Sequence, residues 1–238
     1  MAAPEAPSLR EAVWRANQGL VRAGLVTLSF GNASGIDRAN GIVLIKPSGM
    51  PYDELLPEHL VAVALDDGRV IKGDLRPSSD TPTHLALYRR YAGIGGVVHT
   101  HSVAAAGWAQ ARRAIPPFGT THADHFHGAV PVTRQMREDE VGGEYEAATG
   151  ALIVETLEGA GLEALEMPAV LVASHGPFTW GVDAAQATDN AIALETVAAM
   201  ASATIALDPD AGPMAPYLLE RHFRRKHGPD AYYGQGPR

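Results

Sequence analysis

Cysteine is absent from the 238 residues of this chain, so neither a disulfide framework nor a thiolate metal site can form. Basic residues are also few, 19 lysines and arginines against 27 acidic residues, and no block of them marks a nucleic-acid or anionic-membrane partner. The sequence shows neither eighteen consecutive apolar residues nor the pattern of an export signal. We therefore expect a cytoplasmic protein with no nucleic-acid or membrane partner, folded as a single domain over residues 1–238.

Hydrophobic periodicity predicts an alternation of helices and strands. A capping box at Ser8 begins a helix that Gly24 ends, and short β-type runs follow, with Asp67-Gly68 as a hairpin turn. These β-type runs lie at 26–30, 42–45, 60–65 and 69–72. Helices are then predicted over about 81–91, 104–110, 138–160, 183–205 and 221–227, and strands over 95–101, 129–133 and 169–173. This pattern indicates an α/β protein whose helices cover a mixed sheet.

Three histidines stand near the ends of predicted strands. His99 and His101 would share one face of a strand, because side chains alternate along it. His175 comes directly before Gly176, after another apolar run, and strand ends in α/β sheets converge on one rim. Three neutral imidazoles with an open position suit a divalent metal such as zinc. For each histidine taken alone, the alternative is a hydrogen-bonded side chain at a strand end.

A second histidine cluster, H-A-D-H-F-H at 122–127, follows a loop-like P-P-F-G-T-T stretch. Its spacing favours a loop over a metal site, and we rank it below the strand pair. Asp124 within it is a candidate proton carrier, since an acid among histidines can exchange protons near neutral pH. The alternative is a turn carboxylate that pairs with a neighbouring histidine.

Three glycine- or serine-rich stretches are candidates for binding an anion. Ser78 and Ser79 come just before a predicted helix, whose amino terminus can bind a phosphate, although simple capping explains the same composition. Asp80 would repel a phosphate, so we expect its side chain to turn toward the metal. F-G-N-A-S-G at 30–35 and I-K-P-S-G at 45–49 add Asn32 and Ser48 as hydrogen-bonding groups. Neither matches a dinucleotide fingerprint or a P-loop, which disfavours nucleotide binding.

Lys46 is one of only three lysines in the chain and stands beside a candidate site motif. A buried lysine with a lowered pKa could form a Schiff base, whereas its ordinary role would be a charge at a strand end. The three histidines favour a metal over a Schiff base.

Seven stretches carry a family resemblance over nearly the whole chain: F-G-N-A-S, I-K-P-S-G, P-S-S-D-T-P-T-H, G-G-V-V-H-T-H-S, G-T-T-H-A-D, A-S-H-G-P-F-T-W-G and R-K-H-G-P-D-A-Y-Y-G-Q. In this order they resemble the L-ribulose-5-phosphate 4-epimerase family of the class II aldolase and epimerase superfamily. The resemblance implies a three-layer α/β/α fold with a central, mainly antiparallel sheet. It also implies a homotetramer with active sites at subunit interfaces.

The same resemblance implies the roles of particular residues. A divalent metal, zinc or alternatively manganese or cobalt, would bind at Asp80, His99, His101 and His175. A sugar phosphate would be bound by Gly31, Asn32, Ser48, Gly49, Ser78 and Ser79. Asp124 and Tyr233 of a neighbouring subunit would be the acid/base pair. The implied reaction converts L-ribulose 5-phosphate to D-xylulose 5-phosphate by retro-aldol cleavage and re-addition, within pentose catabolism of the L-arabinose type.

Two related classes remain as alternatives. Sugar-phosphate aldolases of the superfamily carry Glu where this chain has Asp80, and they release the aldehyde. Adducin-type heads are non-catalytic and lack the histidine ligands, all three of which are present here. His125 and His127 depart from the family, whose members tend to have aromatic residues there.

Overall fold

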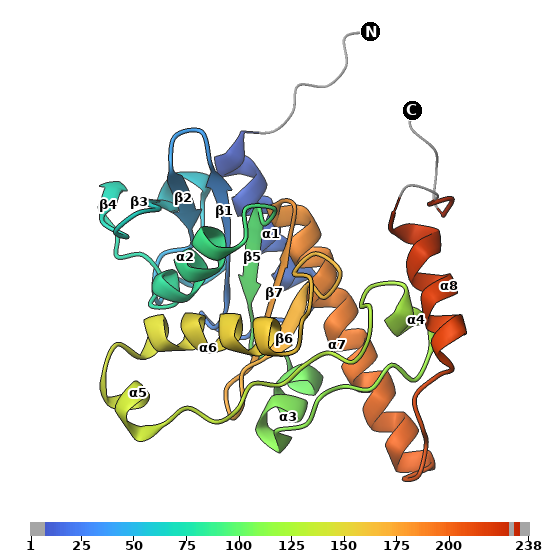
Figure 1. Cartoon of the computed structure of the whole chain (residues 1–238). Helices are drawn as coiled ribbons and strands as arrows, with labels where there is room; N and C mark the ends of the chain where they lie inside the picture. Colours follow the sequence, from blue (N-terminus) through green and yellow to red (C-terminus); the bar gives the residue numbers. More distant parts are fainter. Residues whose placement is uncertain (1–7, 229–230, 234–238) are drawn as a thin grey trace, which may run out of the picture.

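A seven-stranded sheet forms the centre of the structure, a computed structural model that describes residues 8–228 and 231–233 (Figure 1). Its strands run in the order β4-β3-β2-β1-β5-β7-β6, and every neighbouring pair is antiparallel. The strands are β1 (Asn32–Asp37), β2 (Ile42–Ile45), β3 (Val61–Ala64), β4 (Val70–Lys72), β5 (Gly96–His99), β6 (Ala169–Leu171) and β7 (Pro177–Gly181). The mainly antiparallel sheet is confirmed, whereas the mixed sheet suggested by periodicity alone is wrong.

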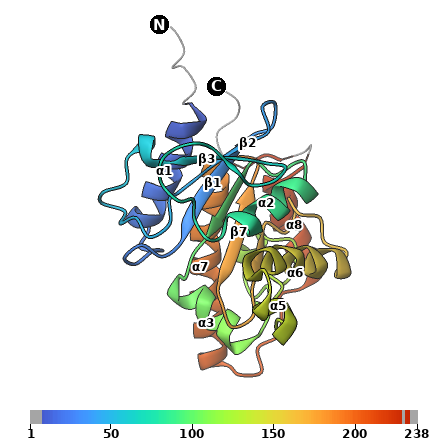
Figure 2. The same cartoon turned by 90° about the vertical axis from the view of Figure 1, so that its left-hand side faces the viewer.

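Helices cover both faces of this sheet. They are α1 (Leu9–Arg22), η1 (Pro57–His59), α2 (Thr81–Arg90), α3 (Val103–Ala111), α4 (Thr120–Ala123), α5 (Glu138–Gly142), α6 (Tyr145–Gly159), α7 (Ala184–Leu207) and α8 (Pro216–Lys226). Helices α1 and α7 pack together on one face, and α2 and α6 pack together on the other (Figure 2). The three-layer α/β/α architecture is therefore confirmed.

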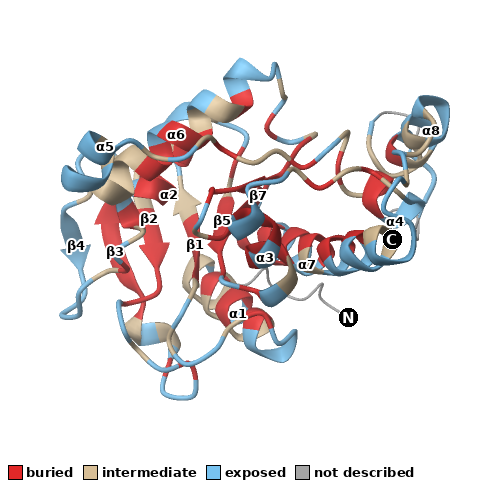
Figure 3. Cartoon of the chain, turned by 90° about the horizontal axis from the view of Figure 1, so that it is seen from below, coloured by how far each residue is buried: buried red, intermediate tan, exposed pale blue. Residues whose placement is uncertain are grey.

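Alternation along the strands divides the core between the two faces. Val97 of β5 packs with Tyr88 of α2 and Ile153 of α6, whereas Val98 packs with Val13 of α1 on the opposite face. Because side chains alternate along a strand, the successive residues Val97 and Val98 contribute to opposite apolar layers. Buried residues follow the strands and the helix faces turned toward them, while α8 at the far end is largely exposed (Figure 3).

Helix α7 is long and apolar enough, by length and composition alone, to cross a membrane. It is instead a core helix, since ten of its residues are buried, and it packs against β5 and β7. Its apolar character is explained by this packing.

The boundaries of α1 and the hairpin were predicted well, whereas α8 begins at Pro216, before its predicted start at residue 221. The hydroxyl of Ser8 accepts a hydrogen bond from the backbone of Glu11, and Gly24 adopts a left-handed φ of 69° beyond the end of α1. The hairpin at Asp67-Gly68 joins β3 to β4 as expected.

Three local predictions were wrong. Residues 26–30 form no strand, because Leu28 adopts a left-handed φ of 55° and the chain turns there. Residues 129–133 make only isolated bridges, since Pro131 has no amide hydrogen to donate to a ladder. The helix predicted over 138–160 is two helices, broken where Gly142 and Gly143 separate α5 from α6.

Candidate metal centre and adjoining pocket

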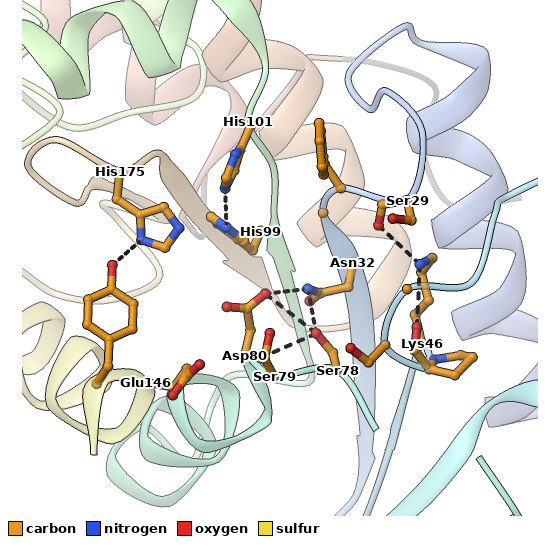
Figure 4. A pocket seen from close by; sticks show the side chains of 16 residues that line it. Ser29, Asn32, Lys46, Ser78, Ser79, Asp80, His99, His101, Glu146 and His175 are labelled. Atoms are coloured by element: carbon orange, nitrogen blue, oxygen red, sulfur yellow. Dashed lines mark hydrogen bonds between the residues drawn. The ribbon is translucent and has the colours of Figure 1, made fainter. Parts of the chain in front are cut away.

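Three histidine side chains from separate segments meet at one end of the sheet. His99 is the last residue of β5, His101 lies two residues beyond it, and His175 lies in the turn between β6 and β7. Their available ligand atoms all lie within 4.8 Å of one another, and the Nε2 atoms of His99 and His101 are 3.0 Å apart (Figure 4). In the described part of the chain this is the one group of three or more potential ligands found this close together.

The electrostatics of the group suit a metal. Burial lowers the pKa of His99 to about 3, and burial also lowers the pKa of His175, with the charge of His101 as a further cause. These imidazoles are therefore neutral at physiological pH and present lone pairs. Imidazole nitrogens brought this close can share one cation between them. The donor set therefore fits a divalent transition metal.

The outer nitrogens of two rings are occupied. Nδ1 of His99 donates to the carbonyl oxygen of Pro177 at 2.9 Å. Nδ1 of His175 lies 3.3 Å from the hydroxyl of Tyr145, at the start of α6. Hydrogen bonds of this kind fix the tautomer of a ligand histidine and direct Nε2 inward.

Asp80 lies at the amino-terminal end of α2, in the same pocket as the histidines (Figure 4). Its side chain does not cap the helix and instead accepts a hydrogen bond from Asn32 Nδ2 at 2.7 Å. Burial opposes ionisation, but electrostatic interactions with the nearby rings of His99 and His84 and the bond from Asn32 outweigh it and lower the pKa of Asp80. The side chain is thus an anion that faces the pocket, as the sequence predicted, but it is not one of the three groups within 4.8 Å.

Backbone pairing brings the phosphate-binding candidates together. Asn32 of β1 pairs directly with His99 of β5. The amide of Ser78 donates to the carbonyl of Lys46, and the amide of Ser48 donates to the carbonyl of Arg76. All six predicted residues therefore line one pocket with the histidines: Gly31, Asn32, Ser48, Gly49, Ser78 and Ser79.

Gly31 shows why this corner requires glycine. It adopts φ 78°, and a Cβ there would lie 2.8 Å from the carbonyl oxygen of His99. Only glycine permits this close approach without strain.

Lys46 lines the same pocket and is almost completely buried, with 1% of its surface exposed. Burial lowers the pKa of its ammonium group to about 8. Its Nζ donates to the carbonyl oxygens of Ser29 and Pro47 at 3.3 and 3.4 Å and lies 4.7 Å from the centre of the Tyr52 ring. Lys46 is the one lysine or arginine among the described residues that line the pocket.

Sequence reasoning did not single out five residues of this lining: Ser29, Phe30, Pro47 and, at the start of α6, Tyr145 and Glu146. The last two begin α6, and the prediction of one continuous helix concealed that start. The paired glycines Gly142 and Gly143 were the signal that could have revealed it.

Asp124 and Tyr233 lie elsewhere in their own chain. Neither is among the described residues that line the pocket, and both contact α8. Arg225 donates to both carboxylate oxygens of Asp124, and its guanidinium carbon lies 4.7 Å from the centre of the Tyr233 ring. Burial opposes ionisation of Asp124, but hydrogen bonds from Arg225 and His222 outweigh it and lower its pKa. Asp124 and Tyr233 thus share one site, apart from the histidine group.

The cluster at 122–127 does not form a second metal group in the part of the chain that the structure describes. Its rings bond to different partners: His122 to the carbonyl of Gly128, and His127 to two carboxylates. The ring nitrogens of these two histidines are thus engaged by other groups of the protein.

Comparison with known proteins gives a consistent result. The family model described as "Class II Aldolase and Adducin N-terminal domain" matches residues 11–202. A protein of Salmonella paratyphi C (strain RKS4594) named L-ribulose-5-phosphate 4-epimerase UlaF is 53% identical over 227 residues, which cover 95% of this chain and 98% of that protein.

Solved structures share the fold. An L-fuculose 1-phosphate aldolase superposes with a TM-score of 0.76 at 22% identity, covering 94% of this chain and 97% of that one. YgbL from Escherichia coli, described as a putative aldolase/epimerase/decarboxylase, gives a TM-score of 0.70 at 28% identity, covering 90% and 96%. At 22% identity, the likeness to the L-fuculose 1-phosphate aldolase concerns the fold alone.

Proposed function

Because this chain belongs to the class II aldolase and adducin N-terminal domain family, we propose that it is a metal-dependent L-ribulose-5-phosphate 4-epimerase. The observation that carries the proposal is the meeting of three imidazoles with a pocket of serines, glycines and one lysine. The near full-length likeness to a relative of that name supports the choice of reaction. The product would be D-xylulose 5-phosphate, formed in the cytoplasm during pentose catabolism of the L-arabinose type.

We assign the metal to Asp80, His99, His101 and His175. Zinc suits three imidazoles and a carboxylate, and manganese or cobalt could replace it. When bound, the ion supplies the Lewis acidity that stabilises negative charge developing during C3–C4 cleavage. Asn32 holds the carboxylate of Asp80 in the pocket, while Pro177 and Tyr145 orient two of the rings.

We assign the phosphate of the substrate to the opposite part of the pocket. The hydroxyls of Ser48, Ser78 and Ser79 and the amide groups around Gly31 and Gly49 would donate hydrogen bonds. Lys46 supplies the positive charge, since its ammonium is the cation of this lining. A held phosphate would keep the two-carbon aldehyde from escaping while it rotates.

The acid/base pair would come from a second copy of the chain. A proton carrier must reach hydrogen-bond distance of the C4 oxygen, yet Asp124 and Tyr233 do not line their own chain's pocket. They can therefore act only on a substrate held by a neighbouring subunit. We accordingly propose a homotetramer with each site shared between two subunits.

The reaction then needs two proton transfers. One group takes the proton from the C4 hydroxyl, the C3–C4 bond breaks, and glycolaldehyde phosphate forms. After this fragment turns its other carbonyl face toward C3, the bond forms again. The second group donates a proton to the new C4 oxygen, and exchange with solvent returns both groups to their starting protonation states, so that protons balance over the cycle.

Complementation between inactive variants tests the shared site. His99→Ala should lose metal, and Tyr233→Phe should retain metal, and each alone should be nearly inactive. Subunits of the two variants that are mixed by unfolding and refolding should regain activity at about a quarter of the sites, because random assembly restores that share of intact pairs. A mixture as inactive as its components would contradict a site shared between subunits.

The identity of the product distinguishes an epimerase from an aldolase. An aldolase would release free glycolaldehyde phosphate, whereas an epimerase returns it to the ketose. The adducin-type alternative is disfavoured by the presence of all three histidines in one group.

A further inference from the structure

Five of the chain's ten histidines gather away from the metal pocket, on α4, on the segment just after it, or at α8. These are His122, His125, His127, His222 and His227. The proposed function uses none of them. Helix α8 is largely exposed at the edge of the molecule, beside α4 (Figures 1 and 3). Within one chain, polar contacts therefore add to the packing of the buried Phe223 in holding this helix.

His127 lies between two carboxylates. Its Nε2 is 2.8 Å from an oxygen of Glu220, and its Nδ1 is 3.1 Å from an oxygen of Glu166. An ionised carboxylate only accepts hydrogen bonds, so both ring nitrogens must carry a proton to satisfy this arrangement. A neutral ring would turn a lone pair toward one of the two oxygens. The geometry is therefore that of the imidazolium form.

The two carboxylates belong to different parts of the protein. Glu220 lies in α8, whereas Glu166 lies between α6 and β6, and its carbonyl also accepts a hydrogen bond from the amide of His127 at 3.0 Å. The charged ring thus ties α8 to the segment that leads into the sheet. Its side chain is only 27% exposed, which partly shields the bonds from water.

Stacked rings connect this tie to Asp124. The ring of His127 stacks on Phe223, the buried residue of α8, at 4.5 Å, and Phe223 stacks on His227 at 4.4 Å. Nε2 of His227 in turn lies 3.0 Å from the carbonyl oxygen of Asp124. A shift of α8 at His127 would therefore move the groups around Asp124.

Another cation faces the same carboxylates. Arg224 Nε lies 2.7 Å from Glu220, and its NH1 lies 3.5 Å from Glu166. Hydrogen bonds from Arg224, and then from His127, lower the pKa of Glu220, so this carboxylate stays ionised. With His127 protonated, two cations face two anions. Without that proton Arg224 faces both alone, so α8 would loosen rather than detach.

We propose that His127 is a positioning residue whose protonated ring clamps α8 to the body of the protein and so holds Arg225 and His222 on Asp124. The consequence for catalysis rests on the proposed role of Asp124, whereas the clamp itself does not. The clamp needs a proton on each ring nitrogen, so it is expected at acidic pH and not at alkaline pH, where a histidine ring carries a single proton.

Hydrogen exchange of the metal-loaded, full-length protein tests the clamp. Amide exchange in peptides from α8 is measured by mass spectrometry at about pH 6 and about pH 8.5, spanning the range in which histidines titrate, and is corrected for intrinsic rates. We expect opening of α8 to increase about fivefold with pH, the effect of a partly shielded ion pair. In His127→Gln, whose amide donates to one carboxylate only, opening should be high at both pH values. His59→Gln, on η1, is the matched control and should keep the pH step.

Each outcome decides the proposal. A step that persists in His127→Gln would assign it to His222 or His227 and overturn the clamp, as would a native protein without any step. His127→Tyr, which keeps a ring on Phe223, is compared in the same way if the glutamine variant fails to fold. Hydrogen exchange is measured without any catalytic turnover, so a wrong substrate assignment would leave this result unchanged. If the step vanishes in the variant while the pH profile of turnover stays native, the clamp stands and its effect on Asp124 is refuted.

Discussion

Gly176 occupies a position where a single added methyl group should disturb all three histidines. A Cβ at Gly176 would lie 2.7 Å from the carbonyl oxygen of Thr100, 3.4 Å from His101 Cδ2 and 3.5 Å from His99 Cε1. The backbone of Gly176 also closes the turn that carries His175, since its carbonyl accepts the amide of Val172 at 2.9 Å. The first contact is with backbone, which cannot move aside as a flexible side chain would.

The size of the effect follows from this geometry. Relief of the contact requires a shift of about half an ångström or more, which is roughly the tolerance of a functional site. Overpacking of this kind costs roughly 1–3 kcal/mol of stability. We expect Gly176→Ala to weaken metal binding by about 10- to 100-fold, the effect seen when the surroundings of metal ligands are disturbed.

Competition with a chromophoric chelator measures this affinity, and thermal unfolding of the metal-free protein measures the stability. Gly107→Ala is the matched control, because a Cβ there meets no atom within 4 Å and the residue lies within α3. That control should bind metal normally and gain up to about 1 kcal/mol from helix propensity. Native metal affinity in Gly176→Ala would refute the reasoning that this turn fixes the histidine group.

Three further predictions concern side chains around the pocket and the core. Tyr145→Phe should weaken metal binding about tenfold without unfolding the chain, because the hydroxyl beside His175 is lost; native affinity in a chelator competition would contradict this orientation. Lys46 has a pKa of about 8, so its charge falls as pH rises through that value. The KM for the phosphorylated substrate should therefore increase between about pH 7 and pH 9 and be high and flat in Lys46→Met; a native KM that is constant over this range would argue against a phosphate contact. Asn17 is fully buried, donates to the carbonyls of Val13 and Ala33, and accepts the amide of Ala33. Asn17→Ala should cost about 2–3 kcal/mol in urea unfolding, because buried backbone groups lose their partner; a loss well below 1 kcal/mol would show that water replaces the side chain.

The sequence located the histidine group but for a partly mistaken reason. His99 and His101 were expected to share a strand face, yet β5 ends at His99 and His101 lies beyond it. The two Nε2 atoms still lie 3.0 Å apart, so both rings face the same pocket although the paired strand ends two residues before His101. The motif therefore identified which residues gather, while the path of the backbone between them required the structure.

Other errors share a physical origin in pairing and packing. A run such as residues 129–133 has strand propensity, but a ladder also needs a partner with free amides, and Pro131 interrupts it. The position of Asp124 could not be predicted from periodicity, because its partner Arg225 is 101 residues away and lies on α8. Local patterns contain no information on such distant ion pairs.

A metal-reconstituted assay on L-ribulose 5-phosphate tests the central claim most directly. D-xylulose 5-phosphate is followed by a coupled enzyme, with a chelated sample and His99→Ala as controls. The account predicts xylulose 5-phosphate that depends on metal and on His99, with no free glycolaldehyde phosphate. Absence of this product from a protein that retains bound metal and its oligomeric state would contradict the epimerase assignment, and release of the free aldehyde would identify an aldolase instead.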